Sequence, residues 1–280
     1  MTVQLNTFSD ISTIVNPILE RSLAVARDNN VMAGLVTPFS AEGSEDRKFY
    51  QYSAVTINTL GESDDMTSQA FTPSILGTIT PAEYGAQYFL TDQRVASDWN
   101  AVREDAAQEL GAGMGNHVDV NLCGLFNSFT GGSAGASGSL ATWAYFFELM
   151  SKLRTKYAPM PYVFVCKPAH WFSLGKAASV GATVTNAPAK QNALADNFYV
   201  GNVAGVEIYV TENCEESSTD AYAGMFSRAA IGLDIRRPFR IEPDRDPSRR
   251  GYELNASMVY GYGLYRPTFG VYGIFKNAYS

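Results

Sequence analysis

Residues 228–276 read RAAIGLDIRRPFRIEPDRDPSRRGYELNASMVYGYGLYRPTFGVYGIFK, and this stretch decides the fold class of the chain. It opens with a short apolar run and a basic run, which end in the turn Asp-Arg-Asp-x-Ser-x-Arg at 244–250. A long run rich in Tyr and Gly follows and ends in Arg-Pro-x-x-Gly-Val at 266–271. Apolar and aromatic runs bounded by Pro, Ser and Gly predict long strands joined by a polar turn.

The composition is that of an ordinary globular protein and excludes several classes. The chain has 280 residues, 46% hydrophobic and 18% charged, so we expect one large or two small domains. Its net charge of -7 argues against a protein that grips nucleic acid over most of its surface. The polar start predicts no secretory signal, and no apolar run has the roughly 18 residues of a membrane span. Three cysteines without a CxxC spacing predict free thiols in a reducing compartment.

The first half of the chain predicts two helices with a β-rich segment between them. Apolar residues at the helical spacing predict one helix over 10–28 and another over 98–129. Short β-rich runs at 49–52, 55–57 and 84–90 alternate with polar turns. This alternation favours an extended two-stranded arm over a compact domain.

The helix expected over 98–129 is the longest element. About thirty residues correspond to roughly 45 Å, too long for a small domain to bury end to end. Gly111, Gly113 and Gly115 weaken it and indicate a bend or the close approach of another chain. Apolar residues line one side of it: Val102, Ala106, Leu110, Met114, Val118, Leu122 and Leu125.

The second half predicts strands and helices in separate groups. The Gly/Ser stretch 131–139 predicts a flexible loop at a domain boundary. A buried strand at 162–166 follows a helix over 140–157, and further strands are expected at 198–210 and 222–235. The residues expected to point inward from that helix are Leu140, Trp143, Phe146, Phe147, Met150 and Leu153. The absence of a βαβ rhythm predicts an α+β fold.

Possible metal ligands lie at spacings that argue against a metal site. Only residues three or four apart share a face of a helix, so His117 and Asp119 point in different directions. His117, Asp119 and Cys123 therefore do not form a set of three metal ligands. Cys166 and His170 are interrupted by a proline at a strand end. We expect structural roles for these residues, with no metal and no cofactor.

Catalytic motifs are equally incomplete. Gly135-Ala136-Ser137-Gly138 is one residue short of the Gly-x-Ser-x-Gly elbow of a hydrolase. The glycines at 111, 113 and 115 lie inside a helix, not after a strand as a dinucleotide-binding motif requires. An enzyme is not expected, although an unrecognised soluble small-molecule enzyme stays open as an alternative.

With these elements in place, the chain resembles the tailed-phage major capsid proteins of the Hong Kong ninety-seven fold over nearly its whole length. Residues 228–276 are similar to the C-terminal β-segment of that family, and the order of the expected elements matches its layout. Several shorter phrases carry the resemblance further: Asp10-Ile11-x-x-Ile14-Val15-Asn16, Val25-Ala26-Arg27-Asp28, Leu90-Thr91-Asp92-x-Arg94, Leu125-Phe126-x-Ser128-Phe129 and Pro168-x-His170-Trp171.

The resemblance implies a division of the α+β chain into five parts. These are an N-terminal arm (1–34), an extension loop (35–80), a peripheral domain with a long spine helix (81–130), an axial domain (131–225), and a C-terminal β-segment that returns to the peripheral domain (226–280).

The function that the resemblance implies is that of a major capsid protein of a tailed double-stranded DNA bacteriophage. Such a subunit self-assembles in the host cytoplasm into hexamers and pentamers of an icosahedral virion capsid. Its implied partners are copies of itself, packaged DNA, a portal protein and a decoration protein, with no membrane. Many relatives begin with a helical scaffolding region, whereas this chain reaches the N-arm soon after Met1, so a separate scaffolding protein or none is implied. An encapsulin-type bacterial nanocompartment shell is the alternative on the same fold.

Arginine is concentrated near the C-terminus, with seven of fourteen between 228 and 250. The planar guanidinium suits fixed pairs between subunits, and DNA contact and a solvated face are the alternatives. Lys48 is the only lysine of the expected extension loop, but no matching asparagine and glutamate are found for a cross-link. The acidic stretch 215–220 predicts a solvated loop. The candidate subunit-interface residues are Arg47, Lys48, Arg236, Arg237, Arg240, Asp244, Arg245, Asp246, Arg249 and Arg250.

Overall fold

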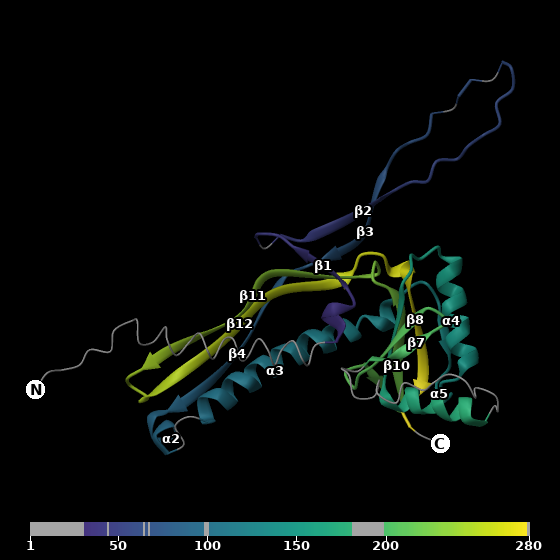
Figure 1. Cartoon of the computed structure of the whole chain (residues 1–280). Helices are drawn as coiled ribbons and strands as arrows, with labels where there is room; N and C mark the ends of the chain where they lie inside the picture. The colour runs from purple at the N-terminus through teal and green to yellow at the C-terminus, as the bar shows by residue number, and fades with distance from the viewer. Residues whose placement is uncertain are drawn as a thin grey trace, which may run out of the picture.

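The chain is built on two β-sheets, a long helix and a protruding two-stranded arm. The computed structural model describes residues 31–43, 45–63, 65–66, 68–97, 101–180 and 199–278. The helix expected over 10–28 lies outside these residues. Figure 1 shows the long helix α3 (Ala101–Cys123) lying along one sheet, while the arm leaves the body in another direction. The expected α+β class is confirmed.

A four-stranded sheet is centred on the C-terminal hairpin. Its strands β11 (Ile231–Asp246) and β12 (Gly251–Leu264) pair antiparallel along their whole length, with register shifts on either side of Arg237. The sheet is completed by β4 (Ala82–Thr91), antiparallel to β12, and by β1 (Thr37–Ser40), parallel to β11. The long strands and the polar turn expected from the sequence are therefore confirmed.

The helix α3 packs against this sheet with the face that the sequence predicted. Its buried apolar residues belong to the same core as the inner side chains of β11 and β12, and they recur every fourth position: Leu110, Met114, Val118 and Leu122. The described helix has 23 residues, about 35 Å at 1.5 Å per residue. It ends earlier than expected because the chain tightens at Gly124, where the amide of Leu125 donates to the carbonyl of Leu122 at 3.3 Å.

The second sheet has seven strands, and one of its faces has a separate core, while Val163, Val165 and Phe226 on the other face join the first core. Its strand order is β5 (Ser133–Gly135), β13 (Gly270–Lys276), β10 (Asp220–Ser227), β6 (Tyr162–Cys166), β8 (Val206–Val210) and β7 (Tyr199–Val203), with β9 (Glu216–Ser217) against β10. Every residue of β6 is buried, as expected. The last strand, β13, belongs to this sheet and not to the four-stranded one, so the C-terminal segment returns to both sheets.

Two helices belong to this second unit, α4 (Trp143–Thr155) and α5 (Pro168–Val180). The buried line of α4 is Phe146, Leu149 and Leu153. The expectation for Phe147 was wrong, since its side chain is 45% exposed. Phe147 directly follows the buried Phe146. Successive side chains of an α-helix are rotated by about 100° about its axis, so Phe147 lies outside the narrow buried stripe.

The Gly/Ser stretch 131–139 was wrongly expected to be a flexible loop. Three of its residues form β5, which pairs parallel with β13. A Cβ on Gly131 would lie 2.3 Å from the carbonyl oxygen of Gly270, and Gly135 has a φ of +80°. Glycine serves here for the close approach of two backbones and for a left-handed conformation.

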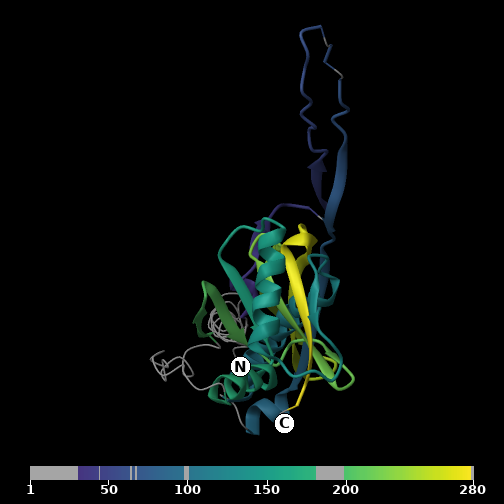
Figure 2. The same ribbon diagram turned by 90° about the vertical axis from the view of Figure 1, so that its right-hand side faces the viewer.

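The arm consists of β2 (Arg47–Tyr52), β3 (Pro73–Ile79) and the loop between them. Figure 2 shows it extending well beyond the rest of the molecule. The strand expected at 55–57 is wrong, since no strand is assigned there. The side-chain amide of Gln69 takes the place of a strand partner: it accepts from the amide of Thr56 at 2.9 Å and donates to its carbonyl at 2.6 Å.

Short elements complete the described fold: η1 (Met32–Gly34), α2 (Asp92–Ser97), η2 (Phe126–Ser128) and η4 (Pro267–Phe269). Of the helices in the described part of the chain, none has both the length and the apolar character needed to cross a membrane.

Candidate subunit interfaces

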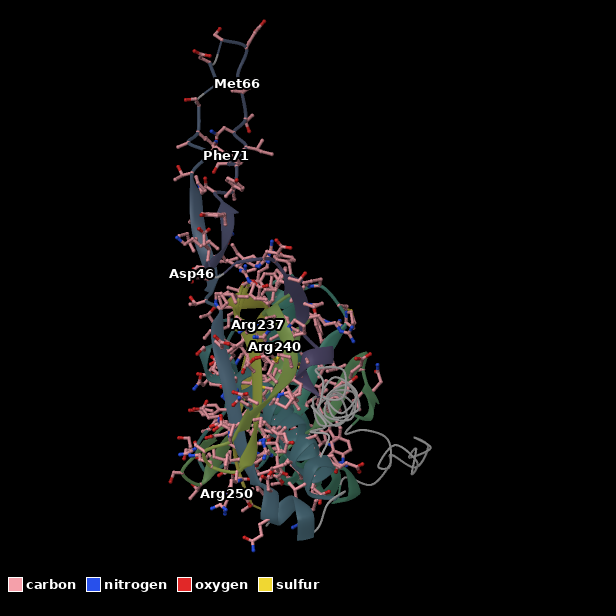
Figure 3. All side chains as sticks on the ribbon, turned by 90° about the vertical axis from the view of Figure 1, so that its left-hand side faces the viewer. Asp46, Met66, Phe71, Arg237, Arg240 and Arg250 are labelled. Carbon is pink, nitrogen blue, oxygen red and sulfur yellow. The ribbon has the colours of Figure 1, made fainter. Side chains whose placement is uncertain are left out.

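The outer part of the arm carries large apolar side chains with no core to cover them. Its most exposed members are Ile57 (92%), Met66 (78%), Val55 (74%) and Phe71 (70%). Figure 3 shows Met66 and Phe71 far from the body, among other side chains of the arm. An isolated hairpin is marginal in water, and a large exposed apolar surface marks an interaction site. The outer arm is therefore the strongest candidate for an interface with another molecule.

The base of the arm is held by a buried carboxylate on the four-stranded sheet. Asp234 is 0% exposed. Its Oδ2 lies 2.9 Å from Nε of Arg47, on β2, and 3.1 Å from Nε of Arg236, its neighbour on β11. We call Arg47, Asp234 and Arg236 the root cluster. Two of the ten predicted interface residues are thus paired within the chain.

Lys48 lies next to Arg47 on β2 but points away from the root cluster. It is exposed, and no ion pair or hydrogen bond of its ammonium group is found among the described residues. Its ammonium group is therefore accessible to a partner.

Two predicted arginines lie along the middle of the sheet. Arg237 pairs with Glu83 of β4, on the far side of Val259 of β12. Arg240 lies 3.1 Å from Glu242, and its Nε is 3.3 Å from the hydroxyl of Ser257. The first pair therefore reaches from β11 across β12 to β4, and Arg240 contacts both its own strand and the neighbouring β12.

The remaining candidates lie in residues 244–250, where the chain turns from β11 into β12. We call these residues the distal turn. Arg245 forms a two-point pair with Asp92, with nitrogen–oxygen distances of 2.5 and 2.8 Å. Its guanidinium also lies 4.5 Å from the ring centroid of Tyr252. The turn is therefore fixed against the start of α2.

Asp246 shapes the distal turn from inside. Its Oδ1 accepts from the hydroxyl and the amide of Ser248, at 2.6 and 2.9 Å, and from the amide of Arg249. The hydrogen bond from the Ser248 hydroxyl is the main reason why the pKa of Asp246 is lowered. Asp244 acts similarly, accepting from the amide of Arg245 at 2.8 Å.

Two arginines of the distal turn point outward. Arg249 is 67% exposed, with its nearest carboxylates at 3.8 and 3.9 Å. Arg250 is exposed, with a φ of +51°, and no side-chain partner is found for it in the described residues. Together with Lys48, these are the predicted cations most accessible to another molecule.

The arginines that are clustered in sequence are thus spread out in space. Figure 3 shows Arg237 and Arg240 partway along the body and Arg250 at the end opposite the arm. The strand β11 has 16 residues, which corresponds to a length of roughly 50 Å. The root cluster and the distal turn are separated by most of this length. The arginines of one charged segment therefore lie at three separate places: the root cluster, the middle of the sheet and the distal turn.

Sequence reasoning missed three of the carboxylates that pair with these arginines. Asp234, Glu83 and Asp92 were not among the candidates. Asp234 had a usable signal, because it is the single charge in the apolar run 231–235, and a charge in a buried strand is rarely without a partner. Glu83 and Asp92 had none, since only the pairing of β4 with β12 brings them near their arginines.

The acidic stretch 215–220 was expected to be a solvated loop, and residues 215–219 are indeed exposed, but Asp220 is not. Asp220 is 4% exposed and accepts from the Ser137 hydroxyl at 2.6 Å and from the amide of Gly138 at 2.9 Å. Glu216 contacts the buried ammonium of Lys167, which also lies 3.3 Å from Glu212. The stretch fastens the edge of the second sheet.

The residues considered as metal ligands are part of the packing. His117 contacts the Tyr260 hydroxyl through Nδ1 at 2.8 Å, and Cys123 is buried against Cys214. His170 is buried edge-to-face against Phe275, with centroids 5.5 Å apart. No group of three or more His, Cys, Asp or Glu side chains suited to a metal is found within the described residues.

Comparisons with known proteins agree with this architecture. A family model described as phage capsid protein matches residues 76–273. No curated protein matches the sequence. Among solved structures, the capsid of cyanophage P-SCSP1u has a TM-score of 0.70 at 14% identity, covering 89% of each chain. A chain of Mycobacterium phage Che8 has a TM-score of 0.62 at 15% identity, covering 87% of this chain and 90% of that one.

The virus-like particle from Pyrococcus furiosus has a TM-score of 0.61 at 12% identity, with 92% and 98% covered. At these identities the solved structures establish the fold, and the fold is shared by phage capsids and by this particle. The family model described as phage capsid protein spans well over half of the chain. The chain therefore belongs to the phage capsid protein family and is a major capsid protein, a structural component of the icosahedral virion shell.

Proposed function

We propose that the outer arm is the main joint of the shell, and that it lies on a neighbouring subunit of the same hexamer or pentamer. The observation that carries this proposal is the exposure of Ile57, Met66, Val55 and Phe71 on a ribbon that has no core of its own. Covering these side chains against a second copy removes apolar surface from water at about 25 cal/mol per Å². Symmetric reuse of one such contact closes an assembly.

The two hydrophobic cores support the proposed division into domains. The four-stranded sheet, α3 and η1 contribute most of one buried cluster, which supports a peripheral domain built from residues 81–130 and most of 226–280 and also includes Val163, Val165 and Phe226 of the second sheet. The seven-stranded sheet and α4 share the other, which supports an axial domain over 131–225 that also receives β13. Residues 35–80 would be the extension loop and 1–34 the N-terminal arm.

The enclosed cargo is proposed to be double-stranded DNA. The net charge of -7 suits an inner wall that faces DNA without binding it tightly. A portal protein, a separate scaffolding protein and a decoration protein complete the proposed set of partners. Lys48, Arg249 and Arg250 are the proposed cations at contacts between subunits, because their charges are the least engaged within the chain.

A shortened arm tests the joint. Replacing residues 53–71 with a two-residue turn retains β2, β3 and the root cluster, so the subunit is expected to stay folded. Electron microscopy and light scattering should find shells for the full chain and only capsomers or monomers for the shortened one. Normal shells without residues 53–71 would reject the arm as the joint. A full chain that stays monomeric at every concentration would reject the assembly itself.

An encapsulin-type shell is the second candidate, because the Pyrococcus furiosus particle shares the fold. Nucleic-acid content separates the two. A phage shell produced in infected cells contains genome-length DNA, whereas a nanocompartment contains protein cargo.

A further inference from the structure

The root of the arm is fixed by charge at one buried point. Arg47 meets both oxygens of Asp234, with Nε–Oδ2 at 2.9 Å and Nη2–Oδ1 at 3.4 Å. Arg236 adds a second cation, with Nη2–Oδ2 at 2.9 Å. Asp234 is 0% exposed, so its negative charge is stabilised by these two arginines and not by water. Removing one arginine leaves a buried negative charge that is only partly compensated.

Arg236 extends the same contact to the chain that leads into the arm. Its Nη1 lies 3.1 Å from the carbonyl of Glu42 and 3.3 Å from that of Gly43, and its Nη2 lies 3.0 Å from that of Glu45. The rigid fork of a guanidinium can hold a carboxylate and a backbone turn at once, which an ammonium group cannot match. The link between β1 and β2 is therefore set by Asp234 through Arg236.

Apolar packing supports the same place. The rings of Phe39, Phe49 and Tyr265 form a triangle with centroid distances of 5.0 to 5.5 Å. On the other strand, a Cβ on Gly77 would lie 2.2 Å from the carbonyl oxygen of Leu264. Thus β3 crosses the end of β12 at backbone contact distance.

These contacts end abruptly at the register shift between Phe49 and Tyr50. Before the shift, Phe49 is packed in the ring triangle and Ile79 is 0% exposed. Beyond it, Tyr50 and the opposing Ile75 are 57% and 56% exposed. The arm has a root attached to the body and an outer part attached only to the root.

We infer that Asp234 is a positioning residue for assembly: through Arg47 and Arg236 it fixes the direction in which the arm leaves a free subunit. The register shift at Phe49 and Tyr50 is the place where the ribbon bends when it docks. This inference rests on the proposed docking of the arm on a neighbour. An arm whose direction is already fixed loses less conformational entropy when it binds a neighbour, so assembly is faster and more accurate.

The direct test measures the arm in subunits that have not assembled. Spin labels at E62C in the arm and K156C in the body report the distribution of distances between them, and the three native cysteines are too buried to be labelled. Arg47→Met keeps an apolar stem against Phe39 but removes the charge. We expect its distance distribution to be at least twice as wide as that of the parent chain. Assembly at equal concentration should be at least tenfold slower.

The matched control is Arg228→Met. Arg228 also pairs with a carboxylate, at 3.7 Å, but that carboxylate is Glu207 of β8 in the second sheet. Its distances and assembly rate should remain those of the parent chain. Asp234→Asn is the second variant, and it should free the arm more than Arg47→Met because both arginines lose the negative charge that they face.

The outcomes separate this inference from the proposed function. Unchanged distances in both Arg47→Met and Asp234→Asn would overturn the positioning role, whatever the assembly result. A freed arm with an unchanged assembly rate would overturn it too, because direction would then not matter. Failure of the parent chain to assemble would reject the proposed joint, while the distances would still report whether Asp234 aims the arm.

Discussion

The backbone amide of Met32 donates a 2.8 Å hydrogen bond to Oδ1 of Asp119, which lies 87 residues further along the chain. The other carboxylate oxygen accepts from the side chains of Asn213, at 2.8 Å, and Thr211, at 3.4 Å. Asp119 is 0% exposed, and burial raises its pKa while these hydrogen bonds oppose the rise. One carboxylate on α3 thus joins the segment before the arm to the loop after β8.

Asp119→Ala should lower the free energy of unfolding by about 2–4 kcal/mol, because it leaves buried donors without an acceptor. Urea unfolding of unassembled subunits measures this change. The control is Asp105→Ala, an exposed residue of the same helix, which should change stability by no more than about 0.5 kcal/mol. A loss below 1 kcal/mol for Asp119→Ala would contradict the joining role.

His170 should make the subunit sensitive to mild acid. Burial lowers its pKa from 6.5 to about 4, with nearby Lys167 lowering it further and Asp220 opposing. The unfolded chain therefore binds a proton at higher pH than the folded one. Stability from this group is complete above pH 6.5, is lost as the pH falls towards 4, and is constant below that value. The loss amounts to about 3 kcal/mol.

The measurement is the free energy of unfolding between pH 7 and 4 for the parent chain and for His170→Leu. The variant lacks the titrating group, so its curve should fall less steeply over this interval. Two parallel curves would show that His170 does not carry the effect.

Gly77→Ala and Gly113→Ala should shift stability in opposite directions. At Gly77 a Cβ meets the Leu264 carbonyl oxygen at 2.2 Å, and the backbone must move, at about 1–3 kcal/mol. At Gly113, in an exposed position of α3, nothing lies within 4 Å, and alanine should stabilise by up to about 1 kcal/mol. Thermal unfolding distinguishes the two, and equal effects would mean that β3 does not cross β12 as described.

Ile57→Ser should impair assembly without affecting the fold. Ile57 is 92% exposed, so the unfolding free energy should change by less than about 0.5 kcal/mol. Shell yield, measured by sedimentation, should fall because the apolar contact with a neighbour is weakened. Ile57→Val retains an apolar side chain and should assemble normally. Full shell yield from Ile57→Ser would place the contact elsewhere on the arm.

Arg249→Glu and Arg250→Glu distinguish subunit contacts from DNA contacts. If these outward-pointing residues pair with carboxylates of a neighbour, charge reversal should reduce shell yield while the subunit stays soluble and folded. If they contact DNA, shells should form normally but contain less DNA. Arg154→Glu, an exposed arginine at the end of α4, is the matched charge reversal. Normal shells with normal DNA from both variants would leave a solvated surface as the role of the distal turn.

Local patterns carried most of the fold. The apolar positions of α3 four residues apart, the continuous apolar strand Tyr162–Cys166 and the polar turn within 228–276 were all readable, and each is confirmed. These features depend on neighbours within a few residues, which the sequence displays directly. The same reading was wrong at Phe147 and at 131–139, where a small shift in helix orientation and a distant strand decided the environment.

The sequence by itself determined that this protein has long C-terminal strands, an amphipathic spine helix and an arginine-rich segment. Only the tertiary structure decided what Arg47, Arg237 and Arg245 do, because their carboxylates come from distant parts of the chain. Arg47 and Asp234 are 187 residues apart, and Arg245 and Asp92 are 153 apart. The sequence displays where the charged residues lie along the chain. An ion pair between distant residues forms only where strand pairing brings both groups to one place. In this chain that pairing turned a single charged segment into a root cluster, a set of cross-strand pairs and a distal turn.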